Sequence, residues 1–382
     1  MKNDGFLRIA AATPHIRVAD CASNKAAISA LLRAANEQGV SAIVFPELCL
    51  TGYTCGDLFH DTTLLQAAER ALQELIEESA SYHLLAVVGL PAAFGASLYN
   101  VAAVFCRGKL LGLTAKSHIP NYSEFYEARH FSPAPDTPIP VTFCGQETLL
   151  GRERIYSCAD APEFTVGVEI CEDLWVPEPP SSRMAQCGAT VLLNPSASDE
   201  VIGKANYRRS LVRDQSARLF CAYAYADAGE GESSTDLVFA GHDLLAENGA
   251  ILAESQPFTT GLVTAEVDLQ RLVQERRRAN TWADRFGGPA PIPFSLSLPE
   301  LTLTRPFARR VSTPTGAGAA RSVFGGTTAV LFAAQLRIKS PDRRGRACRR
   351  KPRSSSSTPA RGRTRRGKRR SGEGQRRRAP PK

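Results

Sequence analysis

Short apolar runs alternate with amphipathic segments over roughly the first three quarters of the chain, as far as Trp282. The apolar runs have the length of buried strands, whereas the amphipathic segments repeat hydrophobic residues at the spacing of one helical face. Asp20 is placed to cap the first such helix and Gly39 to end it. Strands are expected at residues 6–12, 41–45, 84–90, 98–106, 109–116, 164–170, 189–194, 220–226, 244–247 and 251–254, with further helices around 64–76 and 205–219. Helix–strand units mixed with hairpins predict an α/β protein with mixed sheets.

The composition changes after Arg285. Pro, Gly and Ser accumulate there, and from residue 343 onward the chain is an Arg, Ser and Pro tract with almost no apolar residues. Such a tract cannot bury enough apolar surface to offset the entropy lost on folding, so we expect it to be disordered. The sequence therefore predicts three parts: a folded domain over residues 1–285, a linker or degenerate start of another domain over 286–342, and a basic disordered tail over 343–382.

The positive net charge comes from the C-terminal part of the chain. The formal charge of the whole chain is +9, but residues 337–382 contain 20 Lys and Arg against two acids, whereas the other 336 residues contain 27 basic and 36 acidic residues. The predicted folded domain is therefore acidic, and the high pI does not indicate that it binds nucleic acid or anionic lipid. The tail could bind nucleic acid through charge, but it contains no aromatic residue to stack on bases, so no specific nucleic acid is expected as a partner.

The sequence also disfavours several other classes of protein. No apolar run approaches the roughly 18 residues of a membrane-spanning helix, and the N-terminus lacks the apolar core of a secretion signal. The ten cysteines are scattered without a C-x-x-C pair or a Cys/His cluster at zinc-binding spacing, so no metal site is expected. We therefore expect reduced thiols and a cytoplasmic protein. Residues 362–368 have the spacing of a phosphate-binding loop, but Arg369 replaces the required Ser or Thr and no strand precedes the segment.

Three residues that could do chemistry stand at the ends of predicted strands. Cys171 lies just past strand 164–170, Glu47 opens the loop after strand 41–45, and Lys116 closes strand 109–116. Each also has an ordinary structural interpretation: a small buried Cys, a solvated loop acid, and a charged residue that protects a sheet edge. Together, however, they are the base, cation and nucleophile that amide hydrolysis through a thioester requires. A serine hydrolase is disfavoured, because the sequence has no G-x-S-x-G elbow.

Three ordered motifs around these residues resemble those of the nitrilase, or carbon–nitrogen hydrolase, superfamily. They are F-P-E-L-C-L-T-G-Y at residues 45–53, Lys116 with N-Y-S-E-F-Y-E-A-R at 121–129, and G-V-E-I-C-E-D-L-W at 167–175. Other segments are similar, more narrowly, to the N-terminal glutaminase domains of bacterial glutamine-dependent NAD+ synthetases. These are N-P-S-A-S at 194–198, I-G-K-A at 202–205 with Y-R-R at 207–209, and G-E-S-S-T-D at 231–236. The resemblance spans roughly residues 7–282.

The resemblance implies a nitrilase-like α-β-β-α sandwich and a set of roles for the motif residues. It implies that Glu47 is the general base, that Lys116 stabilises the tetrahedral intermediate, that Cys171 is the nucleophile, and that Glu127 helps to hold Lys116. It further implies a group of residues that bind L-glutamine, namely Tyr53, Tyr122, Phe125, Glu172, Ser198 and Lys204. Tyr122 and Ser198 can also be interpreted as ordinary turn and packing residues. No cofactor is implied for the hydrolysis itself.

The chain departs from this resemblance after Trp282. A complete synthetase would continue into an ATP-pyrophosphatase domain that opens on an S-G-G-x-D-S loop, and the nearest match here, G-G-T-T at 325–328, lacks the Asp and the Ser. We therefore expect a truncated or frameshifted reading that begins near residues 305–315. The implied partners are L-glutamine and a missing synthetase domain that would accept ammonia and would use ATP and magnesium, in an assembly that is homo-oligomeric in the intact family. The alternative function is that of a stand-alone nitrilase-type amidase or carbamoylase.

Overall fold

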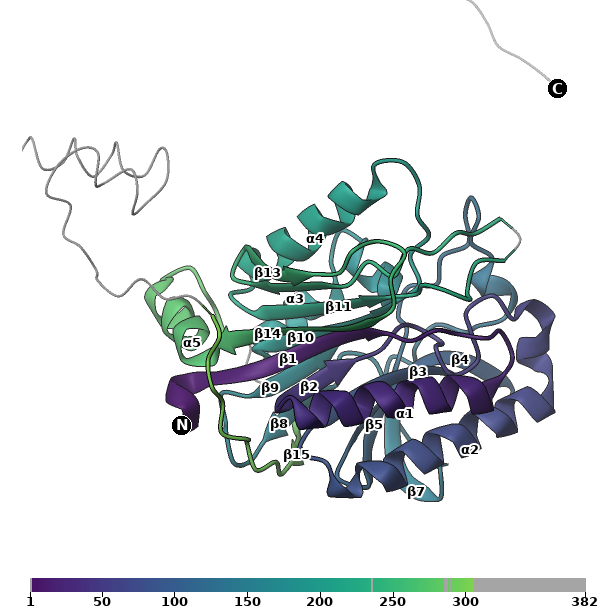
Figure 1. Cartoon of the computed structure of the whole chain (residues 1–382), viewed down its shortest axis with the longest axis horizontal. Helices are drawn as coiled ribbons and strands as arrows, with labels where there is room; N and C mark the ends of the chain where they lie inside the picture. Colours follow the sequence, from purple (N-terminus) through teal and green to yellow (C-terminus); the bar gives the residue numbers. More distant parts are fainter. Residues whose placement is uncertain (1, 235, 285–287, 289, 306–382) are drawn as a thin grey trace, which may run out of the picture. The chain divides into compact units, whose positions relative to one another are not determined.

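Two β-sheets lie face to face between helices in the part of the chain that the computed structural model describes, residues 2–234, 236–284, 288 and 290–305 (Figure 1). One sheet has eight strands in the order β14-β1-β2-β3-β4-β5-β7-β6, and the other has seven in the order β13-β12-β11-β10-β9-β8-β15. The helices are α1 (Cys21–Glu37), α2 (Thr62–Glu78), α3 (Pro180–Gln186), α4 (Lys204–Arg218) and α5 (Leu269–Arg278). Helices α1 and α2 cover the outer face of the first sheet, and α3 and α4 cover that of the second. The predicted α-β-β-α sandwich is thereby confirmed.

The strands of the first sheet come from both ends of the described chain. They are β1 (Phe6–Thr13), β2 (Val40–Val44), β3 (Leu85–Phe94), β4 (Ser97–Cys106), β5 (Lys109–Ala115), β6 (Ile139–Phe143), β7 (Gln146–Gly151) and β14 (Gly261–Asp268). The strands of the second sheet are β8 (Ile155–Cys158), β9 (Thr165–Val168), β10 (Val191–Ser196), β11 (Ala222–Asp227), β12 (Leu244–Glu247), β13 (Ala250–Glu254) and β15 (Ile292–Phe294). Strands β1, β2 and β3 pair in parallel in one sheet, and so do β9, β10 and β11 in the other. The carboxyl ends of parallel strands meet at one edge of a sheet, which is where loops with functional residues commonly lie.

Alternating side chains of the central strands build separate hydrophobic layers. On β10, Val191 and Leu193 pack in the cluster between the sheets, together with Ile9 of β1, whereas Leu192 packs outward with Met184 of α3. This arrangement follows from the geometry of a strand, in which successive side chains point to opposite faces. Both faces of the strand are covered, so the sequence shows a continuous apolar run there instead of an alternating one.

The expected ends of the first helix are confirmed. The Asp20 carboxylate accepts a hydrogen bond from the Ser23 backbone N–H at 3.0 Å, which satisfies one of the free donors at the N-terminus of α1. Gly39 follows the last turn with a φ of 69°, the left-handed conformation in which helices commonly stop.

Several elements are absent from the sequence prediction. Strands β6, β7, β8 and β14 and helix α5 were not expected. Strands β6 and β7 are half-exposed, β8 is buried but only four residues long, and α5 ends in a run of Arg residues. The pairing of β14 with β1, antiparallel from Phe6 with Asp268 to Thr13 with Gly261, is what supports that strand. Its hydrophobic pattern alone is too weak, since tertiary pairing decides strand formation more than local preference does.

The folded unit extends beyond the predicted boundary at residue 285. Strand β15 pairs in parallel with β8, and Phe294, Leu296 and Leu298 are buried between the sheets. Further along, Arg305 forms an ion pair with the buried Glu247 at 2.8 Å. The described part of the predicted linker therefore belongs to the compact unit, which ends at Pro306. The rest of the linker and the predicted tail over 343–382 lie outside the described residues.

Candidate active site

Glu47, Lys116 and Cys171 meet in the structure although they are far apart in the chain. Glu47 follows β2, Lys116 follows β5, and Cys171 begins the 3-10 helix η5 (Cys171–Leu174) after β9. The ammonium Nζ of Lys116 lies 2.6 Å from Glu47 Oε1 and also 2.6 Å from Glu127 Oε1. The Cys171 thiol interacts electrostatically with all three side chains. The structure thus brings the four predicted catalytic residues into one cluster.

The four side chains are withdrawn from water. Glu47 and Lys116 are 0% exposed, Glu127 is 4% exposed and Cys171 is 6% exposed. Burial by itself lowers the pKa of Lys116, but the carboxylates of Glu127 and Glu47 outweigh it, so this pKa lies well above its usual value. Burial, opposed by Lys116 and supported by Glu47, raises the pKa of Glu127 to about 7. Lys116 therefore remains a cation, held between two acids in a site of low dielectric where charge interactions are strong.

A sharp turn and a backbone contact hold Glu47 in place. Its Oε1 accepts a hydrogen bond from Asn100 Nδ2 at 2.6 Å, and its Oε2 accepts one from the Ala197 backbone N–H at 3.0 Å. The next residue, Leu48, has a φ of 52°. A Cβ on Gly89 of β3 would lie 2.4 Å from the Leu48 backbone nitrogen, so only glycine allows this turn to cross β3 so closely.

The backbone of Cys171 is also unusual. Its φ is 46°, a left-handed conformation that costs a residue with a side chain on the order of 1–3 kcal/mol. Its N–H donates to Asn194 Oδ1 of β10 at 3.0 Å. Burial raises the pKa of the thiol well above its ordinary value, and the Glu47 charge adds to this, while Lys116 opposes it. The thiol is therefore neutral at rest, and it needs a base to become a nucleophile.

Most of the predicted glutamine-binding residues gather on a more open side of the site. The Tyr122 hydroxyl donates to both carboxylate oxygens of Glu172 at 3.0 Å. The Lys204 ammonium lies 5.4 Å from the centre of the Phe125 ring and 5.5 Å from that of Trp175. These side chains place an anion, a cation and aromatic faces close together. Trp175 was not among the predicted site residues, although it closes the third motif.

Ser198 and Tyr53 are placed differently from that group. Ser198 is buried, its hydroxyl accepts a hydrogen bond from the Arg208 guanidinium at 3.2 Å, and its backbone N–H donates to Asp227 at 2.9 Å. The Tyr53 hydroxyl donates to Glu127 Oε1 at 2.7 Å, which places this ring beside the catalytic cluster.

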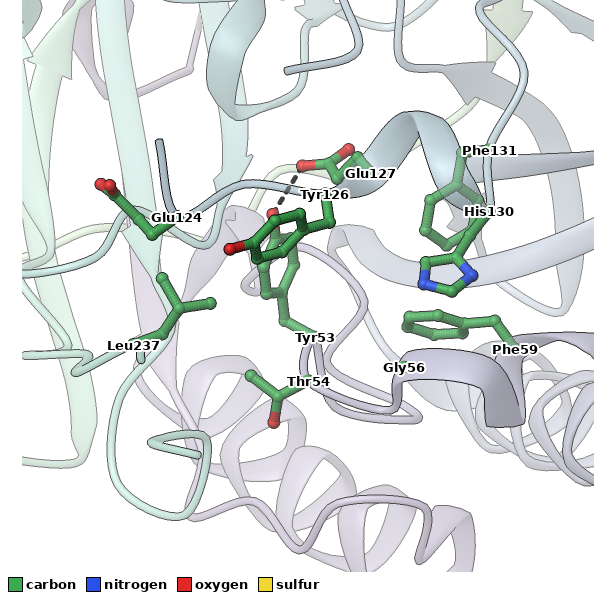
Figure 2. Close-up of a pocket in the computed structure, with 10 residues that line it drawn as sticks. All are labelled: Tyr53, Thr54, Gly56, Phe59, Glu124, Tyr126, Glu127, His130, Phe131 and Leu237. Carbon is green, nitrogen blue, oxygen red and sulfur yellow. Dashed lines mark hydrogen bonds between the residues drawn. The ribbon is translucent and has the colours of Figure 1, made fainter. Parts of the chain in front are cut away.

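Tyr53 and Glu127 also line an aromatic pocket. Figure 2 shows the Tyr53 hydroxyl directed at Glu127, with a cluster of aromatic rings on one side and Glu124 and Leu237 on the other. The clustered rings are those of Phe59, His130 and Phe131, and the rings of Phe59 and Phe131 meet edge to face with their centres 4.9 Å apart. The sequence prediction missed this pocket, and it missed Asn100 and Asn194, because a single Asn or Phe carries no chemical signal until the fold places it beside a reacting group.

Comparison with known protein families gives the class of the protein. Residues 8–277 match the model of the carbon–nitrogen hydrolase family. The chain therefore belongs to the carbon–nitrogen hydrolase family.

Among its relatives are glutamine-dependent NAD(+) synthetases. The chain is 44% identical over 282 residues to that of Mycobacterium tuberculosis, covering 73% of this chain and 42% of that protein. The solved structure of a glutamine-dependent NAD(+) synthetase from Cytophaga hutchinsonii matches with a TM-score of 0.62 at 26% identity, covering 73% of this chain and 46% of that one. An amidase from Nesterenkonia sp. matches with a TM-score of 0.54 at 22% identity, over 71% of this chain and 95% of that one, which shows the fold alone. The chain thus spans less than half the length of the two synthetases.

Within the described residues, every helix is too short or too polar to cross a membrane.

Proposed function

We propose that the folded domain is a glutamine amidohydrolase that releases ammonia through a Cys171 thioester. The observation that carries this proposal is the Lys116 ammonium, held 2.6 Å from each of the two buried carboxylates beside the thiol. A thiol, a carboxylate base and a fixed cation are the groups that cleavage of an amide through a covalent intermediate requires. They come from three separate strand ends, and no simpler structural need places all of them in one buried cluster.

The proposed reaction proceeds in two halves. Glu47 takes the thiol proton as the sulfur attacks the amide carbon, and the negative charge that develops on the amide oxygen is stabilised by the Lys116 cation. Glu47 then returns the proton to the departing nitrogen, so that ammonia leaves and a thioester remains on Cys171. In the second half, Glu47 removes a proton from water as the water oxygen attacks the thioester carbon. The C–S bond then breaks, the acid leaves, and Glu47 returns the proton to the Cys171 sulfur. The base, cation and nucleophile are all side chains of this domain, so we expect the hydrolysis to need neither a metal nor a nucleotide.

We assign the recognition of glutamine to the open side of the site. An amino acid carries an ammonium and a carboxylate, which call for acceptors and a cation respectively. Glu172 and Tyr122 supply the acceptors, and Lys204 supplies the cation. In the structure Lys204 forms an ion pair with Asp199, so the substrate carboxylate would replace or share that partner. Ser198 would complete the pocket beneath, and Phe125 would cover the aliphatic part of the substrate.

The partner of this domain is also a proposal. The synthetases that it resembles are more than twice as long as the matched part, so we propose that an ammonia-consuming synthetase domain is the natural acceptor. ATP and magnesium would belong to that acceptor. The sequence prediction of a truncated or frameshifted reading near residues 305–315 stays a prediction, and sequencing the gene across codons 300–320 would test it.

The proposal is tested with purified full-length chain and a panel of amides. We expect glutamate and ammonia from L-glutamine, unchanged by a chelator, and no AMP or NAD+ when ATP, magnesium and nicotinic acid adenine dinucleotide are supplied. Cys171→Ala should abolish the release of ammonia, because no neighbouring group can replace the thiolate. Cys158→Ala, which removes another buried thiol, is the matched control and should keep the activity. Hydrolysis of short aliphatic amides in preference to glutamine would instead favour the stand-alone amidase.

A further inference from the structure

A chain of buried polar side chains runs from the nucleophile into the second sheet. The Cys171 N–H donates to Asn194 Oδ1 at 3.0 Å, and Asn194 Nδ2 donates to the Tyr223 hydroxyl at 3.0 Å. The Tyr223 hydroxyl in turn donates to Glu169 Oε1 at 2.5 Å. The other Glu169 oxygen, Oε2, accepts the Ser181 backbone N–H at 2.7 Å. Asn194 and Tyr223 are 0% exposed and Glu169 is 1% exposed, so water does not compete for these bonds.

The direction of each hydrogen bond in this chain is determined at its Glu169 end. An ionised carboxylate can only accept, so the Tyr223 proton points toward Glu169 and the phenol oxygen is left as an acceptor. That acceptor selects the NH2 group of Asn194, which leaves the amide oxygen facing Cys171. If the amide were reversed, its NH2 group would face the Cys171 N–H and two donors would oppose each other. Glu169 therefore determines which side of the Asn194 amide meets the nucleophile.

This orientation matters because the Cys171 backbone is strained. Its φ of 46° lies in the left-handed region, and the accepting oxygen of Asn194 is the side-chain contact of its N–H. A conformation of this kind persists only where the surrounding structure holds it, and such residues are concentrated at functional sites.

The position of Glu169 in the core is costly for the fold. Burial raises the pKa of Glu169 to about 7, and within the described residues this carboxylate has hydrogen-bond donors but no ion-pair partner. A buried acid without a cation is disfavoured relative to apolar packing of the same volume. A role in positioning the neighbouring site accounts for its presence there.

We propose that Glu169 and Tyr223 are positioning residues that act through Asn194 to hold the Cys171 thiol against Glu47 and Lys116. Neither residue touches the proposed reacting atoms. The inference deepens the proposed function and rests on it for the activity measurement, but the reactivity of the thiol can be measured without it.

The test uses four variants of the full chain, assayed at about pH 8 so that Glu169 is mainly ionised. Tyr223→Phe removes the acceptor that orients Asn194. Glu169→Gln keeps the volume but offers only one acceptor for two donors. The third variant combines both changes. Tyr156→Phe is the matched control, because Tyr156 is a buried tyrosine of the same sheet whose hydroxyl faces Thr114 at 3.4 Å and not the nucleophile.

Two readouts distinguish positioning from general stability. The first is glutaminase kinetics, in which each single variant should lose about 10²-fold in kcat with KM changed by less than about 3-fold, as expected for a misplaced nucleophile. The second is the rate at which iodoacetamide alkylates Cys171, followed by peptide mass spectrometry in the absence of glutamine, which should fall about 10-fold or more. The double variant should be no more than about 3-fold worse than either single variant, because both changes break one chain. Tyr156→Phe should match the unchanged protein in both readouts.

The outcomes are distinguishable. If the unchanged protein does not hydrolyse glutamine, the proposed function fails, while the alkylation rates still test the positioning role. Folded Tyr223→Phe or Glu169→Gln protein with unchanged kcat and unchanged alkylation of Cys171 overturns the inference. Losses that multiply in the double variant overturn it as well. Melting temperatures identify a variant that fails to fold. The kcat and the Cys171 alkylation rate of the other single variant then test the inference.

Discussion

At the scale of single residues, the site is defined by a cation that two acids share. Lys116 contacts Glu47 and Glu127 at equal distances of 2.6 Å, and Tyr53 donates to the same Glu127 oxygen. Removing Lys116 would leave two buried acids without a cation, whereas removing either acid would leave Lys116 paired with the other one. Catalytic and structural effects of substitutions must therefore be separated by experiment.

The first prediction concerns the two charged residues of the proposed reaction. Glu47→Gln removes the base and Lys116→Met removes the oxyanion-stabilising cation, and each should reduce kcat on the order of 10²–10⁴-fold. Steady-state glutaminase kinetics together with circular dichroism check this result. A folded Glu47→Gln protein that retains most of its kcat would show that another group is the base. Lys25→Met, at an ion pair with the half-exposed Glu74, is the control and should leave kcat unchanged.

The second prediction concerns Glu232, a buried acid that holds the Tyr53 loop. Both of its carboxylate oxygens accept the Tyr53 N–H, at 3.0 and 2.8 Å, and burial raises its pKa to about 8. In the unfolded chain an ordinary Glu pKa is about 4.3, so between these values the folded state holds a proton that the unfolded state does not. This group therefore contributes stability below about pH 4.3 that is lost as the pH rises through about 8.

Glu232→Gln keeps an acceptor for Tyr53 but cannot titrate. We expect the free energy of unfolding to decline less steeply between about pH 6 and 8 in the variant, by up to about 1.4 kcal/mol per pH unit. Urea unfolding at several pH values measures this slope. Parallel slopes for the variant and the unchanged protein would show that Glu232 is already ionised at pH 6.

At the scale of elements, glycines determine how closely neighbouring loops approach. Gly231 has a φ of 96°, and a Cβ there would lie 1.7 Å from the Ile16 carbonyl oxygen. The adjacent residue, Glu230, accepts the Ile16 N–H at 3.0 Å, so this contact joins the loop after β11 to the loop after β1. The first position of the motif at residues 231–236 therefore has a structural role.

The third prediction follows from this contact. Gly231→Ala should destabilise the fold by about 2 kcal/mol or more, because the loop must move and a left-handed residue gains a side chain. Gly203→Ala is the matched control, since Gly203 has a similar φ of 89° but nothing within 4 Å of its Cβ position. The difference between their melting temperatures isolates the steric part. Equal losses for both variants would show that the backbone conformation alone, and not the contact with Ile16, is responsible.

At the scale of the whole molecule, the boundary of the folded unit depends on a strand that comes late in the chain. Strand β15 and the buried Leu296 and Leu298 lie beyond residue 285, where the composition already suggests a linker. Burying side chains of this size contributes on the order of 1.5–3 kcal/mol each, which is a large share of the stability of a typical domain.

The fourth prediction compares two shortened chains. A chain that ends at residue 342 should unfold at the same denaturant concentration as the full chain, because the removed segment 343–382 has almost no apolar residues. A chain that ends at residue 285 loses β15 and should unfold at a clearly lower concentration, by several kcal/mol. Urea unfolding of the three proteins decides between these outcomes. Equal stability of the two shortened chains would place the domain boundary at 285, as the composition suggests.

Local patterns in the sequence determined much of the fold and the identities of the chemical groups. The cap at Asp20, the hairpin turns and the central strands follow from side-chain periodicity and turn residues, which act over a few positions. The motifs around Glu47, Lys116 and Cys171 pointed to amide chemistry, because a base, a cation and a thiol at strand ends form a set that few reactions use.

Only the tertiary structure decided how those groups meet. The sequence could not place Lys116 at equal distances from Glu47 and Glu127, or Asn194 against the Cys171 N–H, because such distances depend on which strands become neighbours. It also missed β14 and β15, whose weak apolar patterns are supported by pairing with β1 and β8 from distant parts of the chain. The physical reason is the same in each case: local preference acts within a segment, whereas burial and hydrogen bonding between segments exist only once the chain has folded.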